Sequence, residues 1–342
     1  MKNEKNQNVT FSDIARYTNF SKTTISRYFN RPDSLTPENQ ERIRQALIEL
    51  NYKENKVAKI LARGETEFVG VLVPNLYIHY FSEMLNQILL TYETYGYKFL
   101  VFVGNQHEDA ERRYLEELMS YKIEGLIVMS HTLPSSELAA FPVPVVSIER
   151  EDAHISSVNC DNYMGAVQAS SLLAKCSCDV LIHINEPTPE TIPAWQRIKG
   201  FKDFCEENHL PHEIMIREMG HSHSSVENCL QGVFSDIEYR YPSVRKGIFF
   251  SDDTRANVFL NLIVRKYGTF PPDYRIVGFD NSPVAESAVF PISTVGQQIG
   301  VIARETVALL VNQIEQRKAG VVSEPVHKVI TPVLVRRTTT EN

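Results

Sequence analysis

The order of hydrophobic and polar residues divides the chain into a short helical part and a longer part of alternating strands and helices. Near the start, hydrophobic positions repeat at helical spacing, as in Ile43, Ala46 and Leu50. From Phe68 onward, short apolar runs such as FVGVLVP alternate with helical patterns, which is typical of a parallel sheet built from βαβ units. The alternation begins again after residues 142–149, with DVLIHIN. We therefore expect two doubly wound units in tandem.

Three helix starts follow one another before residue 40. Thr10 caps the first predicted helix, and Asp13 follows three residues later, where its charge suits the positive end of the helix. Ser21 caps the second, which we expect over residues 22–30, and Thr36-Pro37 begins the third. The pattern of the first two is helix, three-residue turn, helix.

The second predicted helix has an apolar side and a polar, cationic side. Ile25 and Phe29 face the first helix, which leaves the outer face free for a partner. The pattern matches a helix-turn-helix module, whose second helix enters the major groove of DNA. A three-helix bundle without DNA contact is the alternative. The candidate DNA-binding residues here are Ser21, Lys22, Thr23, Thr24, Ser26, Arg27 and Asn30.

The charge distribution supports a nucleic-acid partner for the first part only. Residues 1–64 hold 12 Lys and Arg against 7 Asp and Glu, whereas the rest holds 23 against 35, so the whole chain has a net charge of −7. A basic head on an acidic body indicates that the head alone meets a polyanion such as DNA.

Motifs for catalysis, cofactors and metals are missing. There is no GxGxxG after the first strand, no GxxxxGK[ST] and no GxSxG, and the ten histidines are dispersed. The five cysteines are an odd number without CxxC spacing, which favours reduced thiols. We expect no enzyme, no cofactor and no metal. The polar N-terminus and the short apolar runs predict a cytoplasmic protein with no membrane partner, which joins the nucleoid when it binds DNA.

The head resembles the headpiece of the LacI/GalR family of bacterial transcription regulators. The likeness lies in VTFSDIARYTNFSKTTISRYFN and LTPENQERIRQALIELNYKENKVAKILARG. It implies that Lys22, Thr23 and Arg27 read base edges. Arg27 has the geometry for two hydrogen bonds to guanine.

The resemblance also implies a hinge helix at about residues 55–63. Asn55, Ala58 and Leu61 would contact DNA there, and Leu61 would enter the minor groove and bend the duplex. The family usually has Pro where this chain has Glu54, so the hinge boundary is open.

The body resembles the periplasmic-binding-protein-like core of the same regulators, as in VGVLVPNLYIHYFSEML and IVGFDN. The expected fold is an all-α helix-turn-helix headpiece and an α/β core of two doubly wound parallel-sheet subdomains. We expect the headpiece at 1–63, the first subdomain at 64–160 and 291–322, and the second at 161–290 and 323–342.

In this family, residues matching Arg197 and Asp280 grip hydroxyls of a small ligand, usually a sugar, between the subdomains. Arg only donates hydrogen bonds and a carboxylate only accepts them, so together they satisfy hydroxyls that do both. Aromatic faces could stack on a sugar ring. The alternatives are a structural ion pair and ordinary core packing. The candidate effector-binding residues are Tyr77, Phe81, Asp161, Trp195, Arg197, His221, Asp252 and Asp280.

Three positions depart from the family pattern. The common Ser-Asn-Pro after the first strand reads Tyr77-Ile78-His79, and His221 replaces a frequent aromatic residue. Asp252 stands where Asn is common, which replaces an amide by a pure acceptor. This change favours a hydroxyl-rich neutral or cationic ligand over an anionic one.

These observations predict a repressor of carbohydrate genes that binds a pseudo-palindromic operator as a homodimer. The ligand would open or close the cleft, shift the first subdomains and form or fray the hinge helices. We expect the dimer contact near residues 80–92, and no tetramer, because no heptad tail follows the last strand.

Three other functions remain open from the sequence. A regulator of this family could respond to a nucleobase or a partner protein. The second alternative is a cytoplasmic sugar-binding protein without DNA activity. The third is a sugar-processing enzyme.

Overall fold

The computed structural model describes residues 9–53, 65–150 and 153–341. The chain forms two compact units, Met1–Glu65 (unit 1) and Thr66–Asn342 (unit 2), which are described separately. The expected hinge helix, with Asn55, Ala58 and Leu61, lies outside the described residues. No helix in the described part of the chain is both long and apolar enough to span a membrane.

Unit 1 contains the three predicted helices, α1 (Phe11–Thr18), α2 (Lys22–Asn30) and α3 (Pro37–Glu49). A 3₁₀ turn (Pro32–Ser34) follows α2. The predicted N-terminal caps are present: the Asp13 carboxylate accepts from the Thr10 backbone N–H at 3.0 Å, and Ser21 Oγ accepts from the Thr24 N–H at 3.1 Å. Asn19 ends α1 in the left-handed conformation, with φ 56°, which turns the chain into α2.

The core of unit 1 is small. Ile14, Ile25 and Ile43, one from each helix, are fully buried, and Ala15 is largely buried with them. Phe11 and Phe29 stack beside them with ring centroids 5.0 Å apart. This packing fixes α2 with one side buried and the other exposed.

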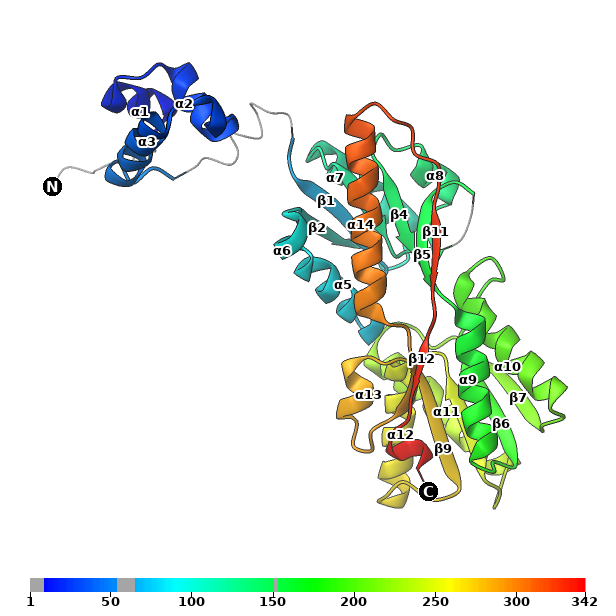
Figure 1. Ribbon diagram of the computed structural model, residues 1–342. Helices are drawn as coiled ribbons and strands as arrows, with labels where there is room; N and C mark the ends of the chain where they lie inside the picture. Colours follow the sequence, from blue (N-terminus) through cyan, green and yellow to red (C-terminus); the bar gives the residue numbers. More distant parts are fainter. Residues whose placement is uncertain (1–8, 54–64, 151–152, 342) are drawn as a thin grey trace. The chain divides into compact units, whose positions relative to one another are not determined.

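Unit 2 contains two six-stranded sheets (Figure 1). The first sheet is parallel throughout in the order β11-β5-β4-β3-β1-β2. Its strands are β1 (Phe68–Val73), β2 (Lys98–Val103), β3 (Gly125–Val128), β4 (Val145–Ile148), β5 (Ser156–Cys160) and β11 (His327–Ile330). The helices that accompany it are α5 (His79–Leu90), α6 (Tyr92–Tyr95), α7 (Glu108–Ser120), α8 (Ser135–Ala139) and α14 (Ile299–Lys318).

The second sheet has the order β12-β10-β9-β8-β6-β7 and is parallel except for β12, which pairs antiparallel with β10. Its strands are β6 (Val180–Asn185), β7 (His212–Ile216), β8 (Lys246–Phe250), β9 (Tyr274–Asp280), β10 (Ser293–Gly296) and β12 (Val333–Val335). Its helices are α9 (Asn162–Lys175), α10 (Gln196–Glu207), α11 (His223–Arg240), α12 (Asp253–Tyr267) and α13 (Pro283–Ser287).

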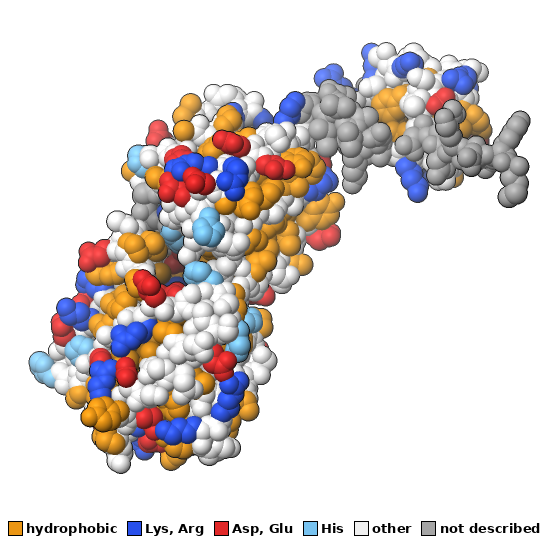
Figure 2. All heavy atoms as spheres, turned by 180° about the vertical axis from the view of Figure 1, so that it is seen from behind, with side chains coloured by type: hydrophobic (Ala, Val, Ile, Leu, Met, Phe, Trp, Pro, Cys, Tyr) orange, Lys and Arg blue, Asp and Glu red, His pale blue; other side chains and the backbone are white. Residues whose placement is uncertain are grey.

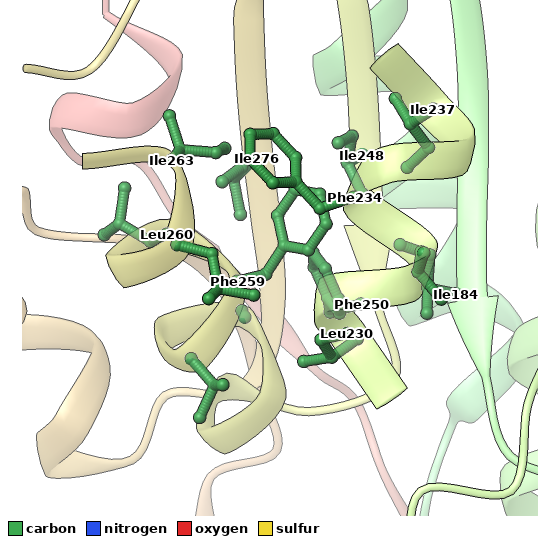
Figure 3. Packing of buried hydrophobic residues seen from close by; sticks show 14 of the residues in the cluster. Ile184, Leu230, Phe234, Ile237, Ile248, Phe250, Phe259, Leu260, Ile263 and Ile276 are labelled. Atoms are coloured by element: carbon green, nitrogen blue, oxygen red, sulfur yellow. The ribbon is translucent and has the colours of Figure 1, made fainter. Parts of the chain in front are cut away.

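Helices cover both faces of each sheet (Figure 1), so the inner strands are buried between two hydrophobic layers, whereas the edge strands β11 and β12 are partly exposed. Figure 3 shows one such layer, where α11 and α12 pack on the second sheet. The rings of Phe234 and Phe259 meet edge to face with centroids 5.5 Å apart, and Phe250 of β8 lies 5.2 Å from Phe259. The predicted fold class, with two doubly wound units after a helical head, is confirmed.

The chain passes between the two sheets three times, after β5, after β10 and after β11. Two of these passages differ from the expected boundaries. Residues 293–296 pair with β9 in the second sheet, whereas we expected them in the first subdomain. Residues 327–330 pair with β5 in the first sheet, whereas we expected them in the second subdomain. Both strands are short and lie next to the passages, so their apolar pattern alone does not assign them to a sheet.

Candidate functional site

The predicted DNA-binding face of unit 1 lies on α2, opposite the buried Ile25. Lys22, Thr23 and Arg27 are exposed on it. Within the described residues, no carboxylate pairs with Lys22 or Arg27. On the side of unit 1 that Figure 2 shows, most of the coloured charged side chains are Lys and Arg.

The remaining α2 candidates hold the helix together. The Ser21 and Thr24 hydroxyls lie 2.8 Å apart at the helix start. Near its end, the Asn30 side-chain amide donates to Ser26 Oγ at 3.1 Å. These contacts stabilise the two ends of α2, the helix that carries the exposed Lys22 and Arg27.

The second candidate site is a cavity of about 180 Å³ between the two sheets of unit 2. It lies at the carboxyl ends of the parallel strands, where open α/β sheets bind their ligands. Segments that follow β1, β2, β3, β4, β6, β7, β8, β9 and β10 each contribute to its wall. Its lining residues are Asn75, Ile78, Tyr80, Phe81, Gln106, His131, Glu149, Asn185, Glu186, Thr188, Ala194, Arg197, His221, Ser251, Asp252, Arg255, Asp280 and Gln297.

Arg197, near the start of α10, lines this cavity and is buried, with 7% of its surface exposed. Its Nε donates to Asn162 Oδ1 at 2.7 Å, and one terminal nitrogen donates to the Ser251 carbonyl at 2.6 Å. Its guanidinium stacks 3.8 Å above the ring of Phe279 and lies 4.0 Å from the Glu149 carboxylate. These contacts hold the cation rigidly in place.

Glu149 directly follows β4 and is buried beside Arg197. Its carboxylate accepts from the Cys160 backbone N–H at 2.6 Å and from the Asn162 amide at 2.7 Å. Burial raises the pKa of Glu149, and the nearby Arg197 opposes that shift.

Asp280 ends β9 with an unusual φ of 113°. Its Oδ1 accepts from the Gln297 amide at 2.6 Å, and no donor among the described residues contacts its Oδ2. Burial raises the pKa of Asp280 well above its usual range, with Arg197 opposing and Asp253 adding to the shift.

Asp253 does not line the cavity, but its hydrogen bonds stabilise the cavity wall. Its Oδ1 accepts from the Thr294 hydroxyl at 2.6 Å and its Oδ2 from the Ser282 N–H at 2.8 Å. Gly278 makes room for it, because a Cβ there would lie 2.2 Å from Oδ1. Asp253 thereby ties the start of α12 to the segments that carry Asp280.

Three buried polar atoms of the cavity wall have no hydrogen-bond partner among the described residues: Tyr80 Oη, Gln297 Oε1 and Arg255 Nε. All three side chains are largely buried, with exposed fractions of 6%, 1% and 5%. Leaving such a group unpaired costs about 1–3 kcal/mol. A ligand with hydroxyl groups could supply the missing partners.

Asp252 and Glu186 both bind Arg255, which lies in the first turns of α12. Asp252 also caps this helix, since its Oδ1 accepts from the Arg255 backbone N–H at 2.9 Å. Its other oxygen accepts from Ser251 Oγ at 3.3 Å. Asp252 is therefore satisfied by protein groups and does not offer a free carboxylate to the cavity.

Besides the contacts of Glu149, two others join the subdomains across the cavity. The His79 backbone N–H donates to Thr254 Oγ1 at 3.0 Å, and His79 Nδ1 lies 3.0 Å from the same oxygen. His221 Nε2 lies 2.7 Å from Gln106 Oε1. Both contacts tie segments of the two sheets together around the cavity.

Five of the eight predicted effector-binding residues line the cavity: Phe81, Arg197, His221, Asp252 and Asp280. The other three lie elsewhere. Tyr77 packs against both flanking cores with its Oη buried, and Trp195 precedes α10 while its neighbour Ala194 reaches the wall. Asp161 caps α9 by accepting from the Met164 N–H at 2.9 Å and lines a neighbouring cavity.

Several residues line the cavity that the sequence did not predict, above all Tyr80, Glu149, Glu186, Arg255 and Gln297. Glu149 and Glu186 directly follow predicted strands, so their position at carboxyl ends was a usable signal. Arg255 and Gln297 gave no such signal, because their orientation depends on the fold.

The described structure contains no cluster of His, Cys, Asp or Glu side chains suited to hold a metal ion. This observation covers residues 9–53, 65–150 and 153–341 only.

Family profiles match most of the chain. The profile for periplasmic binding proteins and the sugar binding domain of the LacI family matches residues 66–252. That for bacterial regulatory proteins of the lacI family matches residues 10–55, and that for a periplasmic binding protein-like domain matches 178–340. The chain belongs to the LacI family of bacterial regulatory proteins. Because this is a family of transcription regulators, the prediction that the chain is no enzyme is confirmed.

Relatives of this LacI-family chain include repressors of sugar operons. The ribose operon repressor of Halalkalibacterium halodurans is 28% identical over 96% of this chain and 97% of its own length. The sucrose operon repressor of Streptococcus mutans is 28% identical over 90% of this chain and 93% of its own.

Solved structures share the fold. The lac repressor dimer bound to operator and the anti-inducer ONPF has a TM-score of 0.79 at 20% identity, over 98% of this chain and 99% of that one. A periplasmic binding protein/LacI regulator from Alkaliphilus metalliredigens, complexed with D-xylulofuranose, has a TM-score of 0.70 at 25% identity, over 81% of this chain and all of that one.

We expect His131 to stay neutral in the folded protein at mildly acidic pH. Its Nε2 donates to the Glu149 carbonyl at 2.5 Å, and burial lowers its pKa to about 4. The unfolded chain takes up this proton near pH ~6.5, so the stability that His131 contributes is complete above that pH and is lost as the pH falls toward 4.

Nitrogen-15 spectra of the imidazole rings test this expectation, with the exposed His209 as the reference in the same sample. The His131 nitrogens should keep their neutral Nε2–H pattern down to pH 5. A midpoint above pH 6 would contradict the burial argument.

Proposed function

We propose that the chain is a repressor of carbohydrate genes that binds operator DNA through unit 1 and is controlled by a small sugar in the cavity of unit 2. The cavity carries the proposal: Arg197, held in place by hydrogen bonds, an Asp280 with an open oxygen and three unpartnered polar atoms meet at the carboxyl ends of two sheets. Such a set satisfies hydroxyls, which both donate and accept.

The size and the relatives support a sugar. A cavity of about 180 Å³ is smaller than the ~300–1,000 Å³ pockets that take drug-sized ligands, so it suits a ligand of monosaccharide size. Two relatives are named for ribose and sucrose operons, and one solved neighbour holds a pentulose.

The exposed cations of α2 support DNA recognition. A recognition helix covers only a few base pairs, so two copies on a pseudo-palindromic operator are needed for a selective site. We therefore propose a homodimer, with Lys22, Thr23 and Arg27 reading bases. The roles of Asn55, Ala58 and Leu61 at the operator centre remain part of this proposal.

The proposed control is a two-state coupling. Ligand contacts with both sheets change the angle between the subdomains, and that change alters how two headpieces are presented to the operator. Coupling free energies of about 1–3 kcal/mol correspond to changes of about 5–150-fold in operator affinity.

We expect Arg27→Ala to lower operator affinity by about 1–3 kcal/mol and to relax the preference at one base pair, because a two-pronged contact to guanine is lost. The operator can be obtained by selecting duplexes from a random pool with the full chain, and affinity measured by mobility shift. Arg44→Ala is the matched control, since Arg44 pairs with Glu41 on α3. Unchanged affinity and base preference in Arg27→Ala would contradict the assignment of α2.

We expect Asp280→Ala to remove the response to sugar while operator binding without sugar stays intact, because Asp280 faces the cavity and not DNA. The sugar is chosen as the one that most raises the melting temperature of the wild-type chain. Operator affinity is then measured with and without it. Asp236→Ala, at an exposed ion pair of the same subdomain, is the control. A normal response in Asp280→Ala would show that the pocket assignment is wrong.

A further inference from the structure

We propose that Glu186 and Asp252 set the charge selectivity of the cavity: by neutralising Arg255, they let it accept unphosphorylated sugars and make it reject their phosphate esters. The inference rests on the proposed binding of a sugar in this cavity. It assigns a task to three lining residues, two of which the sequence did not single out.

Arg255 would otherwise be an anion-binding group. It lines the cavity, and only 5% of its surface is exposed. A buried guanidinium matches phosphate well, because it offers two parallel N–H donors and a permanent charge. In this chain both terminal nitrogens are engaged: one donates to the Asp252 carboxylate and the other to the Glu186 carboxylate.

Arg197 does not replace Arg255 as an anion site. Its Nε and one terminal nitrogen donate to Asn162 and to the Ser251 carbonyl, and Glu149 lies beside it. The lining also holds more negative than positive groups, since Glu149, Glu186 and Asp252 stand against Arg197 and Arg255. Asp280 is left out of this balance because burial raises its pKa well above its usual range. A phosphate ester would therefore meet a net negative wall, and like charges at close range in a dry site repel strongly.

The effect of the charges of Glu186 and Asp252 can be tested with substitutions that keep the size of the side chains. Asp252 caps α12 through Oδ1, and Asn caps helices as well as Asp does. Glu186 Oε1 accepts from the Met219 N–H at 3.3 Å, which the carbonyl oxygen of Gln can also do. Glu186→Gln and Asp252→Asn thus remove one negative charge each and keep a hydrogen-bonding group of similar size.

The main experiment measures binding of matched pairs by isothermal titration calorimetry: ribose, fructose and glucose, each against its phosphate ester. For the wild-type chain we expect at least one free sugar to bind and its ester to bind at least about tenfold more weakly. In Glu186→Gln and in Asp252→Asn this ratio should fall by about tenfold, because Arg255 regains net positive charge. Glu213→Gln is the matched control, since Glu213 pairs with Arg240 on the same subdomain outside the cavity, and it should keep the wild-type ratio.

A second measurement uses inorganic sulfate as the probe and does not depend on the sugar. At constant ionic strength, sulfate should raise the melting temperature of the Glu186→Gln/Asp252→Asn double variant more than that of the wild type or of Glu213→Gln. Circular dichroism checks that the variants are folded.

The inference would be overturned if the wild-type chain bound a phosphate ester as tightly as its free sugar, or bound no free sugar of the panel. It would also be overturned if the two variants kept the wild-type ratio of sugar to ester affinity and sulfate did not raise the melting temperature of the double variant. Failure of operator binding with the charge selectivity intact would instead remove the proposed gene-regulatory role and leave this inference standing.

Discussion

The structure of unit 2 depends on the hydrogen bonds that the buried polar groups around Arg197 make. A buried charge is tolerated only when it is hydrogen-bonded, and Arg197 meets this condition through Asn162 of α9 and the Ser251 carbonyl after β8. These bonds join three segments of the second subdomain. Glu149, from the first subdomain, completes the cluster through Asn162 and the Cys160 N–H. In the same cavity, Tyr80 Oη, Gln297 Oε1 and Arg255 Nε have no partner among the described residues, so the protein alone does not complete the network.

This incomplete network explains why a ligand could control the angle between the subdomains. Tyr80 stands on α5 beside the first sheet, whereas Asp280 and Arg197 belong to the second. A ligand that contacts both sides stabilises one relative position of the sheets over others. The protein's own links between the two sides include three chain passages, the His79 to Thr254 and His221 to Gln106 contacts, and the hydrogen bond from Asn162 to Glu149. A ligand in the cavity would add contacts between two subdomains that are already connected.

The sequence predicted those parts of the structure that depend on local patterns. Thr10, Ser21 and Thr36 marked the starts of the three helices because caps act within one turn, and the apolar runs marked buried strands. The resemblance added Arg197 and Asp280. Local patterns did not show that Asp161 caps a helix away from the cavity, or that Arg255 holds both Asp252 and Glu186. These side-chain contacts depend on which strand ends meet in the folded chain. The pairing of residues 293–296 and 327–330 with their sheets depends on the same tertiary arrangement.

A crystal structure of the full chain with its most stabilising sugar decides whether the cavity between the two sheets is the sugar site. We expect the sugar there, with hydroxyls within hydrogen-bond distance of Arg197 or Asp280 and of Tyr80 Oη or Gln297 Oε1. A sugar bound elsewhere on the chain, with those two atoms still unpartnered, would contradict this expectation.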